Sequence, residues 1–154
     1  FPYTTLFRSR KATPADAKKI AKNNVKLAEE TEERTISKHA AKQGTSSVLT
    51  KQREGWYLIA EHNQEIIGQL FITKEWSDWR NQSIWWMHRV YVQKSCRKKG
   101  VFTALLQELK QRANAEKVFA LRLYIVDTNK KAASIYNKMG FADTSFKILE
   151  KKMK

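Results

Sequence analysis

A short basic turn is the first part of the sequence whose residues could perform chemistry. Residues 96 to 102 read "CRKKGVF", so Arg97, Lys98 and Lys99 stand directly before Gly100. The apolar periodicity that begins at Val101 predicts a helix. The first N–H groups of a helix lack intrahelical partners and carry the positive end of its dipole, and a glycine lets the backbone approach a ligand closely. This order of cations, glycine and helix predicts a site for an anion such as a pyrophosphate.

The turn alone leaves a second interpretation open, in which its three cations are simply solvated. Two other phosphate sites are excluded, because the chain contains neither G-x-x-x-x-G-K-[ST] nor G-x-G-x-x-G. An RNA-recognition motif is not indicated either, because Val101, Thr103 and Ala104 provide no stacking aromatic side chains.

A second group of residues with regular spacing lies in "NKKAASIYNKMGF". Tyr136 stands one helical turn after Ala132 and one turn before Gly140, so it lies on one face of the predicted helix. By itself this spacing is typical of a core tyrosine on an amphipathic helix.

Taken together, the two stretches resemble the GNAT superfamily of acetyl-CoA-dependent N-acetyltransferases. The pyrophosphate motif of that family, Q/R-x-x-G-x-G/A, matches residues 97–102 except at Phe102, where a small residue is usual. The later motif N-x-x-A-x-x-x-Y-x-x-x-G-F matches at Asn129, Ala132, Tyr136, Gly140 and Phe141. The resemblance extends from Arg10 to the C-terminus and is strongest from Ile84 to Phe141.

The resemblance implies a mixed α/β domain with a mostly antiparallel, splayed sheet flanked by helices. It also implies transfer of the acetyl group of acetyl-CoA to a primary amine by direct attack in a ternary complex. Backbone groups of a splayed strand would bind the pantetheine arm and polarise the thioester, amides of the basic turn would bind the pyrophosphate, and Tyr136 would protonate the leaving thiolate. The residues thus assigned to acetyl-CoA are Val90, Tyr91, Val92, Arg97, Lys98, Lys99, Gly100, Val101, Phe102, Thr103 and Asn129.

Amine attack also needs a proton acceptor, because a primary amine is mostly protonated near pH 7. Glu75 is the first candidate, since it ends the strand that precedes the predicted acetyl-binding strand. Glu30 and Glu32 follow, because the resemblance places the polar helix at the wall of the acceptor pocket. Solvation of all three carboxylates is the alternative.

Four of the five tryptophans lie between residues 76 and 86. Trp85 and Trp86 have opposite orientations in a strand, so one of them should lie in the core. Trp76 and Trp79, with Asp78, could line an acceptor pocket that receives a cation against an aromatic face.

The elements that would position these residues follow from apolar periodicity and turn signals. Thr13, Pro14 and Asp16 predict the start of the first helix. The predicted order is helix, helix, strand, strand, strand, helix, strand, helix, strand. The corresponding segments are 13–28, a more polar helix within 29–49 that ends near Gly44, 55–61 and 65–76 around a turn at 62–64, 83–92, 101–109, 120–126, 129–140 and 144–153.

Composition narrows the context further. The chain has 154 residues and a formal net charge of +15, which favours polyanionic partners or ligands. Cys96 is its only cysteine, and no apolar stretch has the length of a membrane span, so a cytoplasmic protein without a membrane partner is expected. The histidines lack metal-ligand spacing, and no metal is expected. Residues 1–9, "FPYTTLFRS", resemble a translated sequencing adapter, so 10–154 is taken as the domain, although a natural short strand is the alternative.

Two further functional hypotheses remain. The first is a nucleic-acid-binding module that uses the many lysines as a phosphate-tracking surface. The wide spread of the cations and the absence of stacking aromatics among them argue against it. The second is a catalytically silent fold that binds CoA, against which the presence of Asn129 and Tyr136 argues. The expected acceptor is a small amine or a peptide amine, and a homodimer is compatible with the sequence.

Overall fold

The computed structural model describes residues 7–31 and 35–154 of the chain. The chain forms two compact units, which meet in sequence at Leu123 and Tyr124. Within the described part of the chain, the first unit contains all five strands and three of the four α-helices, and the second contains the remaining helix. The predicted mixed α/β class is confirmed.

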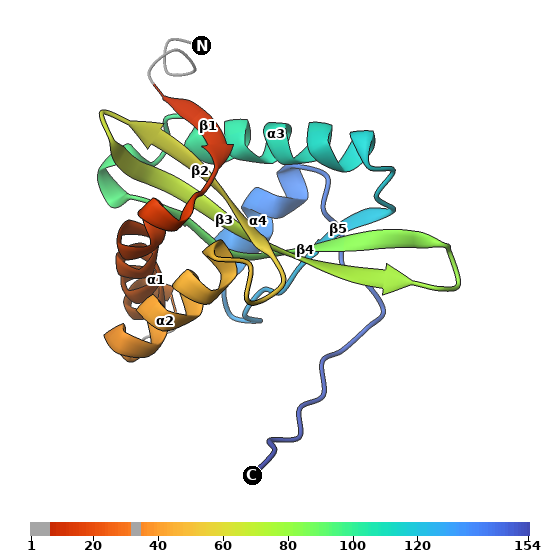
Figure 1. Ribbon diagram of the computed structural model, residues 1–154. Helices are drawn as coiled ribbons and strands as arrows, with labels where there is room; N and C mark the ends of the chain where they lie inside the picture. The colour runs from red at the N-terminus through yellow and green to blue at the C-terminus, as the bar shows by residue number, and fades with distance from the viewer. Residues whose placement is uncertain (1–6, 32–34) are drawn as a thin grey trace. The chain divides into compact units, whose positions relative to one another are not determined.

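The first unit is built around an open five-stranded sheet in the order β1-β2-β3-β4-β5 (Figure 1). Neighbouring strands from β1 to β4 are antiparallel, and β5 runs parallel to β4. The sheet is therefore mostly antiparallel, as predicted. The strands are β1 (Arg8–Lys11), β2 (Trp56–His62), β3 (Glu65–Ser77), β4 (Gln82–Val92) and β5 (Ala120–Leu123).

Helices cover both faces of this sheet. Helices α1 (Ala17–Thr31) and α2 (Lys38–Leu49) lie on one face, and α3 (Val101–Ala115) lies on the other (Figure 1). Burial of both faces explains why β2 carries an unbroken apolar run from Tyr57 to Ala60 rather than alternating polar residues.

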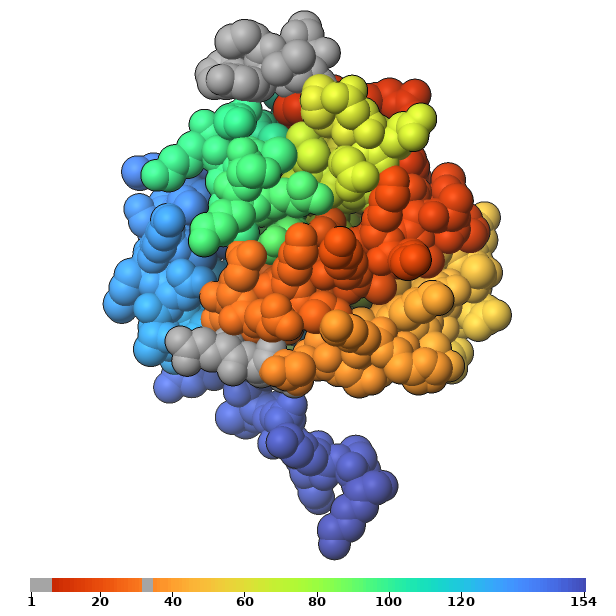
Figure 2. All heavy atoms as spheres, turned by 90° about the vertical axis from the view of Figure 1, so that its left-hand side faces the viewer, coloured from red at the N-terminus to blue at the C-terminus, as the bar shows by residue number. Residues whose placement is uncertain are grey.

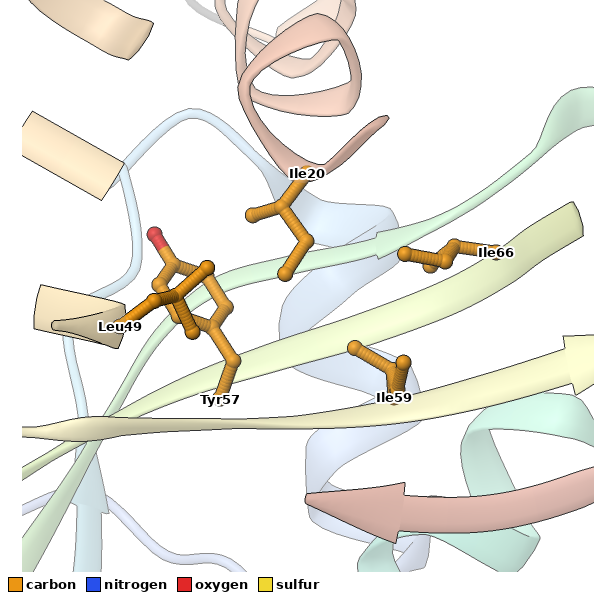
Figure 3. Close-up of a cluster of buried hydrophobic side chains, with 5 residues drawn as sticks. All are labelled: Ile20, Leu49, Tyr57, Ile59 and Ile66. Carbon is orange, nitrogen blue, oxygen red and sulfur yellow. The ribbon is translucent and has the colours of Figure 1, made fainter. Parts of the chain in front are cut away.

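Side chains from both helices and two strands form the core under α1 and α2. Tyr57 stacks on Phe71, with ring centroids 4.8 Å apart. Complete burial of each aliphatic member stabilises the fold by roughly 1.5–3 kcal/mol. Figure 3 shows the cluster between the helices and the sheet: Ile20, Leu49, Tyr57, Ile59 and Ile66.

The opposite face packs against α3 at very short range. A Cβ atom at Gly68 of β3 would lie 2.7 Å from Cγ1 of Val101 and 3.2 Å from Cδ1 of Leu105. Both are buried residues at the start of α3. Gly68 therefore fixes how closely the first turn of α3 approaches the sheet.

The first helix follows its predicted start signal, but the predicted start and end of the second helix are both wrong. Residues 29–31, which include Glu30, belong to α1. Asp16 accepts a hydrogen bond from the Thr13 amide at 2.8 Å, and a short 3₁₀ turn, η1 (Pro14–Asp16), leads into α1. The second helix begins after Ser37, which caps the amide of Ala40, and continues beyond Gly44 to Leu49. A helical glycine costs only about 1 kcal/mol, and burial of Leu49 outweighs that cost.

The predicted boundary between the suspected adapter segment and the domain, at Arg10, lies inside strand β1. Arg8 and Ser9 pair with Glu61 and Ala60 of β2, so these last two residues of the suspected adapter segment occupy strand positions. The guanidinium of Arg10 contacts the carboxylates of Asp16 and Glu61. A non-native origin of residues 1–9 stays a prediction.

The second unit consists of α4 (Lys130–Lys138) and its flanking segments. The Asn129 side chain accepts the Ala132 amide at 3.1 Å and so caps the helix. The amide of Gly140 donates to the carbonyl of Asn137, and that of Phe141 donates to the carbonyl of Tyr136. With Gly140 at φ 93°, this is a Schellman ending.

The predicted closing strand at 144–153 is wrong, because this segment has no helix or strand. The second unit contains no strand with which it could form a ladder, and an isolated strand leaves its backbone groups without partners. Within the described ranges, 7–31 and 35–154, no helix has the length and apolarity needed to cross a membrane.

Gly68 and Gly44 offer a matched test of the close packing of α3 against the sheet. Gly68→Ala should lower the free energy of unfolding by about 1–3 kcal/mol, because its methyl group would push against Val101. Gly44→Ala should raise it by about 0.5–1 kcal/mol, because Gly44 lies within α2 and a Cβ there has nothing within 4 Å. Urea unfolding of the three proteins measures both effects. A stabilising Gly68→Ala would contradict the close approach of α3.

Candidate active site

The basic turn has the backbone conformation that an anion site requires. After the 3₁₀ turn η2 (Lys94–Cys96), Lys98 and Gly100 adopt the left-handed region, with φ of 60° and 81°. Helix α3 starts immediately, and its first intrahelical bond runs from the Ala104 amide to the Gly100 carbonyl. The N–H groups before Ala104 thus point out of the helix end, where they can meet an anion.

The cations of this turn do not have equivalent roles. Lys98 and Lys99 are exposed at the helix end. Arg97 instead donates from Nε to the Val92 carbonyl at 2.8 Å and forms an ion pair with Glu30 of α1. The Tyr91 hydroxyl donates to the same carboxylate at 3.1 Å. Arg97 therefore ties the turn to β4 and α1.

This ion pair also places the predicted acceptor residue Glu30. The hydrogen bond from Arg97 lowers the pKa of the Glu30 carboxyl, which makes that group a weaker base. Figure 2 shows α1 and α2 side by side, with the segment that follows β4 next to α1. Glu32, the other acidic residue predicted here, lies outside the described residues.

Strand β4 is irregular where acetyl-CoA contacts were predicted. Gln69 pairs with Tyr91 and Phe71 pairs with His88, so two residues of β4 lie opposite Leu70 alone. This is a β-bulge, and one of its residues, Arg89, has a φ of 52°.

The pairing of β4 with β5 runs only from Ile84 to Met87. Among the described residues, those from His88 to Val92 have no strand partner on that side. The sheet is therefore splayed, as predicted, and Val90, Tyr91 and Val92 lie where the two strands no longer pair. One backbone group of this stretch, the Val92 carbonyl, accepts from Arg97.

The structure places Glu75 far from this stretch. Glu75 pairs with Ile84, six residues before Val90, which corresponds to about 20 Å along the strand. Its carboxylate accepts a hydrogen bond from Nε1 of Trp86 at 2.7 Å and lies 3.8 Å from Arg122. Its assignment as the base stays a prediction that this separation does not favour.

The aromatic residues at the end of the β3–β4 hairpin are more remote still. Trp76 pairs with Ser83, and Asp78 and Trp79 lie in the turn that follows. Trp76 and Trp79 are 61% and 92% exposed, so these side chains enclose no pocket by themselves. Trp85, in contrast, is buried against Trp56, as expected for one residue of the pair.

Sequence reasoning missed a histidine on the α1–α2 face of the sheet. His88 is half-buried, and its Nε2 lies 2.8 Å from Oγ1 of Thr73 on β3. Burial, followed by the positive charge of Arg89, lowers the pKa of His88. The available signal was its position, two residues before Val90 in the predicted acetyl-binding strand.

The second unit holds the other two predicted residues, Asn129 and Tyr136. Asn129 is the N-cap of α4, and the Tyr136 ring contacts Phe141 edge-on, with centroids 5.6 Å apart. Burial raises the pKa of Tyr136 to about 12. The phenol therefore carries its proton throughout the neutral range.

Comparison with known proteins decides the family. The model of the acetyltransferase (GNAT) family matches residues 21–141. The chain belongs to the GNAT family. A crystal structure of a possible acetyltransferase from Clostridium difficile 630 is 31% identical, covers 96% of this chain and 98% of that one, and has a TM-score of 0.90. No curated protein matches the sequence significantly.

More distant GNAT-like structures share the fold. A predicted acetyltransferase with acetyl-CoA from Clostridium acetobutylicum has a TM-score of 0.76 at 18% identity, with coverage of 94% and 96%. A ribosomal-protein-alanine N-acetyltransferase from Brucella melitensis biovar Abortus 2308 has a TM-score of 0.77 at 15% identity, with coverage of 96% and 99%. The GNAT fold predicted from the sequence is therefore confirmed, and the family match supports the acetyltransferase class.

The left-handed backbone at Gly100 gives a direct test of the anion site. Gly100→Val should weaken acetyl-CoA binding at least about tenfold, because a β-branched residue disfavours φ 81° and fills the approach to the helix end. Isothermal titration measures the affinity, and circular dichroism verifies the fold. Gly44→Ala, on α2, is the control and should bind as the parent does. Unchanged affinity in Gly100→Val would exclude this turn as the pyrophosphate site.

Proposed function

We propose that this GNAT protein is an N-acetyltransferase that transfers the acetyl group of acetyl-CoA to a primary amine. The observation that carries the proposal is the uncapped start of α3 behind Gly100, next to the stretch of β4 without a β5 partner. Acetyl-CoA carries a pyrophosphate, which would need an anion site, and a pantetheine arm with amide groups, which would need unpaired backbone groups of a strand.

In this proposal each part of the turn and strand has one task. The backbone amides from Lys98 to Thr103 bind the pyrophosphate, assisted by the charges of Lys98 and Lys99. Backbone groups of Val90, Tyr91 and Val92 bind the pantetheine arm and polarise the thioester carbonyl, which is an oxyanion-type contact. Arg97 contributes indirectly, because its bonds to Glu30 and Val92 hold the turn in place.

The chemical step is direct attack of the amine on the acetyl carbonyl. The C–N bond forms as the C–S bond breaks, and the thiolate receives a proton from Tyr136. Asn129 assists at the pantetheine arm. These two roles rest on the family motif. A raised pKa keeps Tyr136 protonated, which a proton donor requires.

The acceptor is an amine of a small molecule or a peptide. The Brucella neighbour is named for a protein acceptor, but at 15% identity that acceptor does not carry over to this chain. A panel of amines, polyamines, amino acids and peptides, assayed by free thiol release from acetyl-CoA, identifies the class. Tight binding of duplex DNA or RNA without affinity for acetyl-CoA would favour the nucleic-acid alternative.

Tyr136→Phe tests the proposed proton donor, because it keeps the ring that contacts Phe141 and removes only the hydroxyl. We expect kcat to fall at least about tenfold while acetyl-CoA affinity stays nearly intact, since a general acid acts mainly in the transition state. Steady-state kinetics with one identified acceptor, and a separate binding measurement, check both quantities. Turnover of the variant at the parental rate would leave Tyr136 as a packing residue only.

A further inference from the structure

His88 lies on the sheet face that α1 and α2 cover. Its ring is 5.7 Å from that of Phe71, which stacks on Tyr57. The Tyr57 hydroxyl in turn accepts a hydrogen bond from Asn24 of α1 at 3.2 Å. The imidazole is thus placed by packing from the strand side and by the 2.8 Å contact with Thr73.

Its distance from the proposed acetyl-binding stretch separates His88 from Glu75. His88 and Val90 are two residues apart, which limits their distance to about 7 Å. The position opposite Glu75 lies four regular strand residues, or about 13 Å, before His88 itself. Glu75 is also engaged by Trp86.

Glu30 does reach the stretch, because it accepts a hydrogen bond from the Tyr91 hydroxyl. Its bond to Arg97, however, lowers the pKa of the Glu30 carboxyl and makes it a weaker base. His88 remains as the nearby group whose neutral form can accept a proton.

We propose that His88 accepts the proton of the acceptor's ammonium group, with Thr73 as the positioning residue that orients the imidazole. This inference rests on the proposed acetyl transfer. One ammonium proton passes to His88 and then to solvent, and the neutral amine forms the C–N bond. The remaining excess proton on nitrogen balances the one that the departing thiolate takes up, so the products are an amide, a thiol and one released proton.

Burial, followed by the positive charge of Arg89, lowers the pKa of His88 and favours its neutral form. Arg89, the next residue on β4, acts on both the imidazole and the Tyr57 phenol. Glu75 on β3 and Arg122 on β5 flank the neighbouring Trp86, where they form a pair of opposite charge. A neutral imidazole at pH 7 can accept a proton, as this role requires.

His88→Gln keeps an amide that can bond to Thr73 but cannot accept a proton. We expect kcat to fall at least about 100-fold, with unchanged acetyl-CoA affinity. His62→Gln, at the last residue of β2, is the matched control and should keep parental turnover. A loss below about threefold in His88→Gln, or equal losses in kcat and acetyl-CoA affinity, would overturn the role as proton acceptor.

The exposed Arg89 gives a second, independent readout. Arg89→Gln removes a positive charge beside His88, so the imidazole pKa should rise and the acidic limb of kcat should move to higher pH. Titration of the imidazole signals by NMR measures the same shift without turnover. The inference would be overturned if the imidazole pKa rises and the acidic limb of the kcat profile does not move. A parent protein that neither binds acetyl-CoA nor releases thiol would instead overturn the proposed function itself.

Discussion

The change of partner along β4 is the constraint on which the site depends. Up to Met87 the strand is held between β3 and β5, and beyond it β3 is the only strand partner among the residues that the structure describes. The bulge opposite Leu70 falls within this second part, and a bulge bends and twists its strand. The same short stretch therefore frees backbone groups on one edge, orients His88 on one face and directs the chain into the basic turn.

A buried polar network fixes α1 opposite that stretch. Gln69, which is fully buried and pairs with Tyr91, donates to Asn24 at 2.8 Å and accepts from Asn23 at 3.1 Å. Removing one partner of such a network leaves the others unsatisfied, at a cost of about 1–3 kcal/mol each. The network thereby specifies one position of α1, from which Glu30 reaches Arg97. The placement of a helix and the geometry of the turn are thus coupled through side chains 67 residues apart.

Most elements could be predicted from the sequence because their signals are local. Apolar periodicity marked the hairpin, β4 and α3, and the motifs marked the basic turn and α4. The bulge could not be predicted, because "WWMHRVYV" contains no glycine or proline to interrupt its strand pattern. The ion pair between Arg97 and Glu30 could not be predicted either, because only tertiary packing brings the two residues together. The false strand at 144–153 has strand-forming residues, but a strand also requires a neighbour.

In the motif at residues 129–141, some residues serve the fold of α4 and one group is left for chemistry. Asn129 is there to cap α4, and Gly140 is there because the Schellman ending needs a left-handed residue. An apolar contact between the last helical turn and the residue after the glycine often accompanies that ending, and the rings of Tyr136 and Phe141 supply it. A phenylalanine at 136 would provide the same contact. The helix ending thus explains the ring of Tyr136 and leaves its hydroxyl to a different requirement, for which proton donation to a thiolate is the chemistry that we propose.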